Sequence, residues 1–167
     1  MSLNITEKKA VVKAVSEVAS KANAVVAASY MGLSAEQMTA LRAQARAQGV
    51  HLQIVKNTLA KRAFADTEFA NCEEKLVGPL MLAFSTEEPS ASARIFKNFI
   101  KENAAAKDMV QFLWFDGDVL EANQLDKIAS LPTKDEAIAM LMSVMKAPVG
   151  KLVRTIDAVR VQKEEAA

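Results

Sequence analysis

Apolar residues recur with two different periods along the chain, and the two periods predict a mixture of helices and strands. From residue 4 to residue 22 they return every three or four positions, which is the repeat of an amphipathic helix. Lys9 lies on the basic edge of this helix. The next segment, 24–31, is short and apolar and is followed by Gly32, which predicts a buried strand.

Capping signals mark the elements that follow. Ser34, with Gln37 three residues later, has the spacing of a capping box and predicts the start of a second helix, which Gly49 ends. Apolar residues occupy every second position of residues 50–54, which predicts a strand over 50–55 with one apolar face. Asn57 is then predicted to cap a short helix.

Two more strands and two more helices complete this part of the chain. Residues 80–84 and 109–115 are short apolar runs that predict strands. Between them, Ser85 and Glu88 have the spacing of a capping box, which predicts that a helix starts after Ser85. Residues 122–131 are predicted to form a small last helix.

The order of these elements, a helix and then β-α-β-β-α-β, predicts an α+β fold. We expect a ferredoxin-like split β-α-β sheet, preceded by a helix and covered by helices on one face. A boundary is expected before Thr133, because Pro132 disfavours helical geometry in the residue before it and Thr133 with Glu136 starts a new capping box. The chain should therefore contain one domain over 1–131 and an extended C-terminal α-helical tail over 132–167.

The tail carries one apolar seam along a helix of about 30 residues, or roughly 45 Å. Pro148 and Gly150 are expected to kink this helix or to split it in two. The pattern leaves three occupants of the seam open: the chain's own domain, a second copy of the tail in a coiled coil, or another protein. The seam consists of Ile138, Leu141, Met142, Met145, Val149, Leu152, Val153, Ile156 and Val159.

Composition narrows the range of functions. The chain has 167 residues and a formal net charge of +1, which fits one domain with a short appendage. Its single histidine, His51, and single cysteine, Cys72, provide neither a zinc ligand set nor a nucleophile with its base. We interpret the many acidic residues as solvated surface charge, and expect no enzyme and no cofactor. The charged N-terminus and the absence of a long apolar stretch predict a cytoplasmic chain without a membrane segment.

One interval of this nearly neutral chain is strongly basic. Residues 37–65 contain no acidic residue, and Arg42 and Arg46 are one helical turn apart within the interval. Guanidinium groups and the free amides at the start of a short helix bind phosphate, so the interval predicts contact with nucleic acid. A solvated helix face followed by a basic loop would produce the same pattern. The candidate RNA-binding residues are Lys9, Arg42, Arg46, Lys56, Asn57, Thr58, Lys61 and Arg62.

Six short segments of the sequence resemble one known family. They are YMGLS at 30–34 with MTALR at 38–42, VKNTLAKRA at 55–63, VGP at 77–79, and LPTKDEAIAMLM with GKLVRT within 131–155. These segments closely resemble the family of bacterial large-subunit ribosomal protein number ten, which lies at the base of the ribosomal stalk. The resemblance covers essentially the whole chain in order.

The resemblance implies a scaffold of the large ribosomal subunit without enzymatic activity. Its domain would bind large-subunit rRNA in the GTPase-associated region, beside ribosomal protein number eleven. Its tail would hold dimers of the acidic stalk protein, numbers seven and twelve of the series, which recruits translational GTPases. Members of the family can also bind the leader of their own mRNA and repress its translation. The length of the tail predicts two stalk dimers, since paired helices occupy about 20 to 24 Å.

A second interpretation keeps the RNA contact and makes the chain a free-standing regulatory module whose tail self-associates as a coiled coil. His51 and Cys72 have no role in either interpretation, and we expect an exposed strand residue and a small half-buried residue. Trp114 is expected in the core rather than as a platform for bases, because its neighbours Leu113 and Phe115 are apolar.

Overall fold

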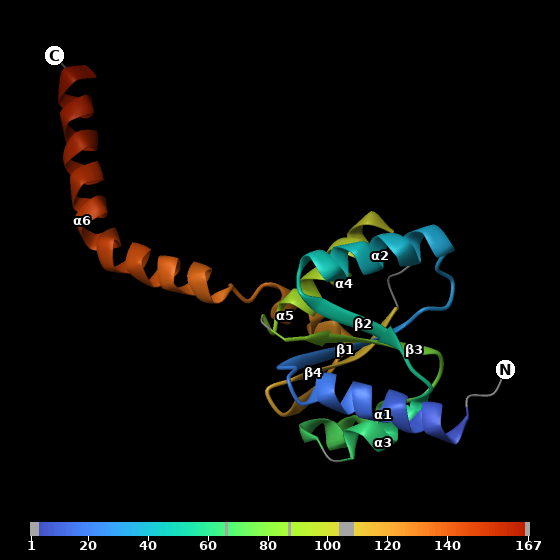
Figure 1. The fold of residues 1–167 in the computed structure, drawn as a ribbon. Helices are drawn as coiled ribbons and strands as arrows, with labels where there is room; N and C mark the ends of the chain where they lie inside the picture. Colours follow the sequence, from blue (N-terminus) through green and yellow to red (C-terminus); the bar gives the residue numbers. More distant parts are fainter. Residues whose placement is uncertain (1–3, 66, 87, 104–108, 166–167) are drawn as a thin grey trace. The chain divides into compact units, whose positions relative to one another are not determined.

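A computed structural model describes residues 4–65, 67–86, 88–103 and 109–165 (Figure 1). Backbone contacts divide the chain into two compact units, Met1–Leu131 and Pro132–Ala167. The first unit contains the sheet, and the second contains a single long helix. The functions assigned to these two parts remain predictions.

The first unit is built on a five-stranded antiparallel sheet with the strand order β2-β3-β1-β4-β5. The spatial order of the first four strands, β2-β3-β1-β4, is that of a ferredoxin-like sheet, which confirms the predicted fold class. Their bounds agree with the four predicted strands to within one or two residues at each end. The strands are β1 (Ala24–Ser29), β2 (Val50–Ile54), β3 (Leu80–Ser85), β4 (Val110–Phe115) and β5 (Asp118–Glu121).

The central strands β1 and β3 are buried on both faces of the sheet. Successive residues of a strand point to opposite sides, so Val26 and Ala28 belong to one apolar cluster and Val25 and Ala27 to another. β3 divides in the same way, with Met81 in the first cluster and its neighbours in the second. A strand that is apolar at every position therefore needs helices on both sides of the sheet.

Three α-helices and a short 3-10 helix cover one face of the sheet (Figure 1). Phe96 and Phe99 are fully buried there, as the apolar spacing of their segment predicts. A short 3-10 helix and the last helix of this layer together replace the predicted helix 122–131. The elements of this layer are α2 (Ala35–Ala47), α4 (Ala91–Glu102), η3 (Ala122–Gln124) and α5 (Leu125–Ala129).

A second layer covers the opposite face, so the prediction of helices on one face is wrong. The two helices that connect the ferredoxin-like strands do lie on one face. The leading helix and the segment between β2 and β3 pack against the other face. Their core is aromatic: the ring centroids of Phe69 and Trp114 are 4.3 Å apart, and those of Phe64 and Phe69 are 5.6 Å apart. The layer consists of α1 (Ile5–Ala19), α3 (Asn57–Phe64) and the 3-10 helix η1 (Glu68–Lys75).

Two of the predicted capping boxes are confirmed by their hydrogen bonds. At the start of α2, the amide of Gln37 donates to Ser34 Oγ over 3.2 Å, and the amide of Ser34 donates to Gln37 Oε1 over 2.9 Å. Thr133 and Glu136 make the same reciprocal bonds at 2.9 and 3.2 Å. Each pair satisfies two of the amides that a helix start leaves without a partner.

Two other predicted caps are wrong. Asn57 lies inside α3, and Lys56 is the N-cap residue, with no side chain capping the helix. α4 follows Ser90 and does not begin after Ser85, because pairing with β1 and β2 keeps Ser85 in the sheet. The Ser85 hydroxyl instead accepts a hydrogen bond from the amide of Ser92 over 3.2 Å.

The sequence pattern missed the short edge strand β5. It pairs with β4 across a two-residue turn that sets Asp118 opposite Phe115. The turn residues Asp116 and Gly117 have φ angles of 52° and 94°, and two positive values are typical of a type I′ hairpin. The Asp-Gly pair was a sequence signal for this hairpin, but a strand of four residues with two apolar positions is too short to show a period.

The second unit consists of the helix α6 (Lys134–Glu165). Pro148 lies inside this helix, which continues beyond it, and the ribbon bends midway along its length (Figure 1). The predicted break is therefore a kink and does not divide the tail into two helices. Residues 166 and 167 of the predicted tail lie outside the described residues.

We expect a chain that ends at Leu131 to fold on its own. All strands and both apolar clusters precede that residue, and the Arg94 guanidinium donates a hydrogen bond to its carbonyl oxygen. Circular dichroism should show one cooperative thermal transition at the temperature of the full-length chain. A chain ending at Gln124 is the control: it lacks the buried side chains of Leu125 and Ile128 and should melt at a lower temperature. A non-cooperative transition after truncation at Leu131 would contradict the division.

The buried thiol of Cys72 gives a second prediction. The side chain is 1% exposed, more deeply buried than expected, and burial raises its pKa from 9.0 to about 11, partly opposed by the Lys75 ammonium. Between these values the unfolded chain loses the proton while the native chain keeps it, so the free energy of unfolding should fall as the pH rises through this window. Urea unfolding of Cys72→Ala should show a shallower decline. Parallel decline of the two proteins would show that another group is responsible.

Candidate nucleic-acid interface and helical tail

Basic side chains gather on the helical layer formed by α1 and α3. The two helices lie side by side (Figure 1), and Val15 and Leu59 share their apolar cluster. The predicted residues Lys9, Lys61 and Arg62 come from these helices and reach solvent. The fold therefore brings Lys9 together with residues that are about fifty positions away in the sequence.

A groove of about 660 Å³ lies along these two helices. Its apolar residues are contributed by both helices, and its cations outnumber its single carboxylate, Glu17. Within the described residues, none of these cations forms an ion pair. Sequence reasoning did not count Lys8 or Lys13 as RNA-binding residues, although Lys13 lies on the predicted basic edge with Lys9. The groove is lined by Lys8, Lys9, Lys13, Arg62, Ile5, Val12, Leu59, Ser16 and Glu17.

The N-terminus of α3 presents free amide groups. The first amides that bond within the helix are those of Leu59 and Ala60, and both donate to the Lys56 carbonyl. The amides of Asn57 and Thr58 have no partner among the described residues, because no side chain caps this helix. An uncapped helix start next to the Lys56 ammonium is a favourable place for an anion.

Asn57 positions a neighbouring loop. Its Nδ2 atom donates to the carbonyl oxygens of Gly78, over 2.8 Å, and Leu76, over 3.4 Å. These bonds join the start of α3 to the segment that enters β3. The side-chain amide is therefore held in one orientation by backbone atoms that are about twenty residues away in the sequence.

Arg42 and Arg46 do not belong to this surface. They are exposed on α2, whose buried residues Leu41 and Ala45 pack against the opposite face of the sheet. Figure 1 shows α2 on one side of the strands and α3 on the other. The acid-free interval 37–65 therefore supplies two separate basic surfaces. α2 packs on one face of the sheet, and α3, which follows β2, packs on the other face.

A cavity of about 440 Å³ lies where β1 and β2 end and β3 begins. Three of the segments that carry the family resemblance meet here, although they lie far apart in the sequence. Sequence reasoning did not count Tyr30 as a functional residue, yet this residue lines the cavity and is 36% exposed. The motif YMGLS was the available signal. The lining residues are Tyr30, Ile54, Val55, Lys56, Asn57, Thr58, Gly78, Pro79 and Leu80.

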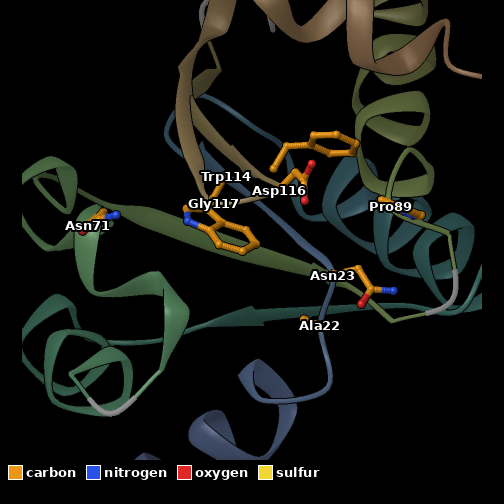
Figure 2. Close-up of a pocket in the computed structure, with 8 residues that line it drawn as sticks. Ala22, Asn23, Asn71, Pro89, Trp114, Asp116 and Gly117 are labelled. Atoms are coloured by element: carbon orange, nitrogen blue, oxygen red, sulfur yellow. The ribbon is translucent and has the colours of Figure 1, made fainter.

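A second cavity, of about 710 Å³, lies at the opposite end of β1 (Figure 2). Trp114 lines it and is 3% exposed, which confirms its predicted place in the core. The indole Nε1 is buried and has no hydrogen-bond partner within the described residues. Asp116 is the one charged residue of the lining, so this cavity lacks the positive character of the other end.

Every predicted docking residue lies on α6 with its side chain in contact with solvent. The exposed fractions of these side chains range from 47% for Ile138 to 72% for Met145. Between Lys146 and Lys163 the helix is basic, since it carries Lys151, Arg154 and Arg160 against Asp157 alone. Arg160 also pairs with Glu164 over 3.1 Å, an exposed pair that contributes little to stability.

Among the residues that the structure describes, no group of three His, Cys, Asp or Glu side chains could hold a metal ion. Over the same ranges, no helix has both the length and the apolar character that a bilayer span requires.

Comparison with known proteins decides the family. The model of Ribosomal protein L10 matches residues 3–101, and that of the Ribosomal protein uL10 C-terminal region matches residues 131–166. The chain belongs to the uL10 family. It is 54% identical to Large ribosomal subunit protein uL10 of Dichelobacter nodosus over 167 residues, covering 99% of this chain and 100% of the relative. The uL10 protein of Psychromonas ingrahamii is 51% identical over 168 residues, covering 100% and 99%.

Membership of the uL10 family confirms the resemblance on which the sequence analysis relied. It makes the chain a structural protein of the large ribosomal subunit rather than an enzyme, and confirms the predicted localisation on the ribosome. The uL10 protein of Legionella pneumophila shows the same relation at 51% identity over 156 residues, with 93% of this chain and 87% of that protein covered. The residues that contact RNA or other proteins are a separate question.

Proposed function

We propose that the domain 1–131 binds large-subunit rRNA at the stalk base and that the tail 132–167 anchors dimers of the acidic stalk protein. The observation that carries the RNA half is the cationic surface of α1 and α3, whose Lys and Arg side chains and helix-start amides lack partners within the described residues. The resemblance assigns the GTPase-associated region as the RNA and ribosomal protein number eleven as the neighbour.

Phosphate contacts explain why this surface leaves its cations unpaired. An ion pair within the protein would compete with the RNA backbone for each ammonium or guanidinium group. The free amides of Asn57 and Thr58 add donors that cannot be neutralised by a change of pH. The set Lys9, Lys56, Lys61 and Arg62 then lies around one helix pair, and Arg42 and Arg46 form a second contact on α2.

The two basic surfaces can be separated by paired substitutions. We expect Lys61→Ala with Arg62→Ala to weaken binding to a transcript of the GTPase-associated region and to flatten the dependence of the binding constant on salt. Each lost phosphate contact lowers the logarithmic slope by about 0.7 to 0.9. Arg42→Ala with Arg46→Ala reports on the α2 surface in the same assay.

Lys151→Ala with Arg154→Ala is the matched control, because it removes the same charge from α6 and should leave the slope unchanged. A wild-type slope for the variant that lacks Lys61 and Arg62 would remove the α3 surface from the interface. Binding to the chain's own mRNA would use the same surface, since phosphate contacts do not depend on base identity.

The exposed seam of α6 supports the docking half of the proposal. A helix face of this length with apolar residues open to water is the surface that a partner helix covers. Met142 and Met145 can adapt their side chains to such a partner. The excess of cations between Lys146 and Lys163 favours an acidic protein over a basic one.

The seam has two parts, one on each side of Pro148, and we propose one stalk dimer for each part. We expect native mass spectrometry to find one copy of the chain with four copies of the stalk protein. Leu152→Asp with Ile156→Asp should release one dimer and leave the other, because a carboxylate in an apolar interface is costly to desolvate. Ile138→Asp with Leu141→Asp should release the other dimer.

Several outcomes would contradict this arrangement. One or three bound dimers would show that the seam is not divided in two. A stable dimer of the chain alone, lost on truncation at Leu131, would favour the self-associating coiled coil. If both doubly substituted chains still bound four copies of the stalk protein, the stalk protein would bind elsewhere on the chain.

A further inference from the structure

The cavity where β1 and β2 end and β3 begins is lined by an exposed tyrosine that lies outside both apolar clusters. Tyr30 is the single tyrosine of the chain and is 36% exposed. The remaining aromatic side chains are buried in the two apolar clusters or packed against them. Tyr30 belongs to neither cluster and forms no ring contact or hydrogen bond within the described residues. Its ring is therefore available to a ligand.

A fixed hydrogen-bond acceptor lies in the lining of the same cavity. The Asn57 side-chain nitrogen is identified by its two partners, since both are carbonyl oxygens and only the Nδ2 atom can donate to them. The Oδ1 atom of Asn57 then has no donor among the described residues. The cavity therefore combines an aromatic surface with an oriented acceptor.

The charge around the cavity indicates an anionic ligand. The lining of the cavity contains no Asp or Glu, and neither do the chain intervals that hold its lining residues, 18–35, 37–65 and 75–86. Lys56 is the one charged residue of the lining, and the free amides of Asn57 and Thr58 lie beside it. An acidic peptide side chain would use the cation and the amides but would leave the exposed ring and the acceptor without a partner.

We propose that this cavity receives one unpaired RNA base, stacked on Tyr30. This inference rests on the proposed RNA binding and assigns a base-binding site to it. An amino or imino group of the base donates to Asn57 Oδ1, and the adjoining phosphate lies at the start of α3 near Lys56. A volume of about 440 Å³ is within the usual range for small-ligand pockets, roughly 300 to 1,000 Å³. The base must be unpaired, because a stacked base within a duplex cannot enter a cavity.

Substitution of Tyr30 separates stacking from phosphate contact. The full-length chain is titrated with a transcript of the GTPase-associated region at several salt concentrations. Tyr30→Ala should weaken binding roughly five- to a hundredfold, the effect of losing one base–aromatic stack, and leave the salt slope unchanged. Tyr30→Phe should bind as the wild type does, since it keeps the ring. Met31→Ala is the matched control, because Met31 is 73% exposed and does not line the cavity.

Fluorescence provides a readout that a change in folding would not reproduce. In Trp114→Phe, Tyr30 is the remaining long-wavelength fluorophore, and stacking on a base should quench its emission when the transcript is added. Replacing the unpaired bases of the transcript by paired ones should abolish this quenching while leaving the salt-dependent part of the binding. The melting temperature of Tyr30→Ala should match the wild type, because the ring is outside both clusters.

The outcomes distinguish this proposal from the one on which it rests. Tight, salt-dependent binding that is unaffected by Tyr30→Ala would overturn the base site and leave the RNA function intact. A loss of affinity with a flatter slope would show that Tyr30 only positions cations, and would also overturn the base site. No binding of the transcript by the wild type would overturn both proposals. Protection of Tyr30 by a protein ligand in place of RNA would assign the cavity to a protein side chain.

Discussion

The burial of β1 and β3 on both faces is the constraint on which the rest of the domain depends. Apart from the serine that ends each strand, every position of β1 and β3 is apolar and buried, and Val25 and Val26 are both almost fully buried although they point to opposite faces. A layer of helices is therefore needed on each side of the sheet, and the ferredoxin-like connections provide only one. The leading helix and the segment between β2 and β3 form the other layer. Removing them would expose the aromatic cluster around Phe69 and Trp114 to solvent.

The second layer also determines where an anion can bind. Its inner side is committed to the core through Leu59 and Phe64, so its charged residues are on the outside. α3 follows β2 closely, which sets its uncapped start at the end of the sheet, beside the turns after β1 and before β3. Asn57 joins two of these segments through its hydrogen bonds to backbone carbonyls. The layer of α1, α3 and η1 therefore determines both the packing of the core on this face and the position of the cationic outer surface.

Much of the fold could be predicted from the sequence because its signals are local. Apolar runs predicted the four main strands, and the pairs Ser34 with Gln37 and Thr133 with Glu136 predicted two helix starts. The continuous apolar character of β1 also indicated two covered faces, a signal that the interpretation as a one-sided sheet did not use. The candidate site was harder to predict. A strand was predicted between Arg46 and Lys61, but its pattern does not show that the helices before and after it pack on opposite faces of the sheet. The hydrogen-bond partners of Asn57 are about twenty residues away in the sequence.

The kink in α6 has a thermodynamic consequence for the binding of the two stalk dimers that we propose. Pro148 costs a helix about 3 kcal/mol, and Gly150 costs about 1 kcal/mol relative to alanine. The segments on either side, 134–147 and 149–165, are close to the length of about 12 to 15 residues at which an isolated helix is only marginally stable. Helical order in one segment is then poorly transmitted to the other. A ligand that orders the first half does little to prepare the second, so the two halves should fill independently, without cooperativity.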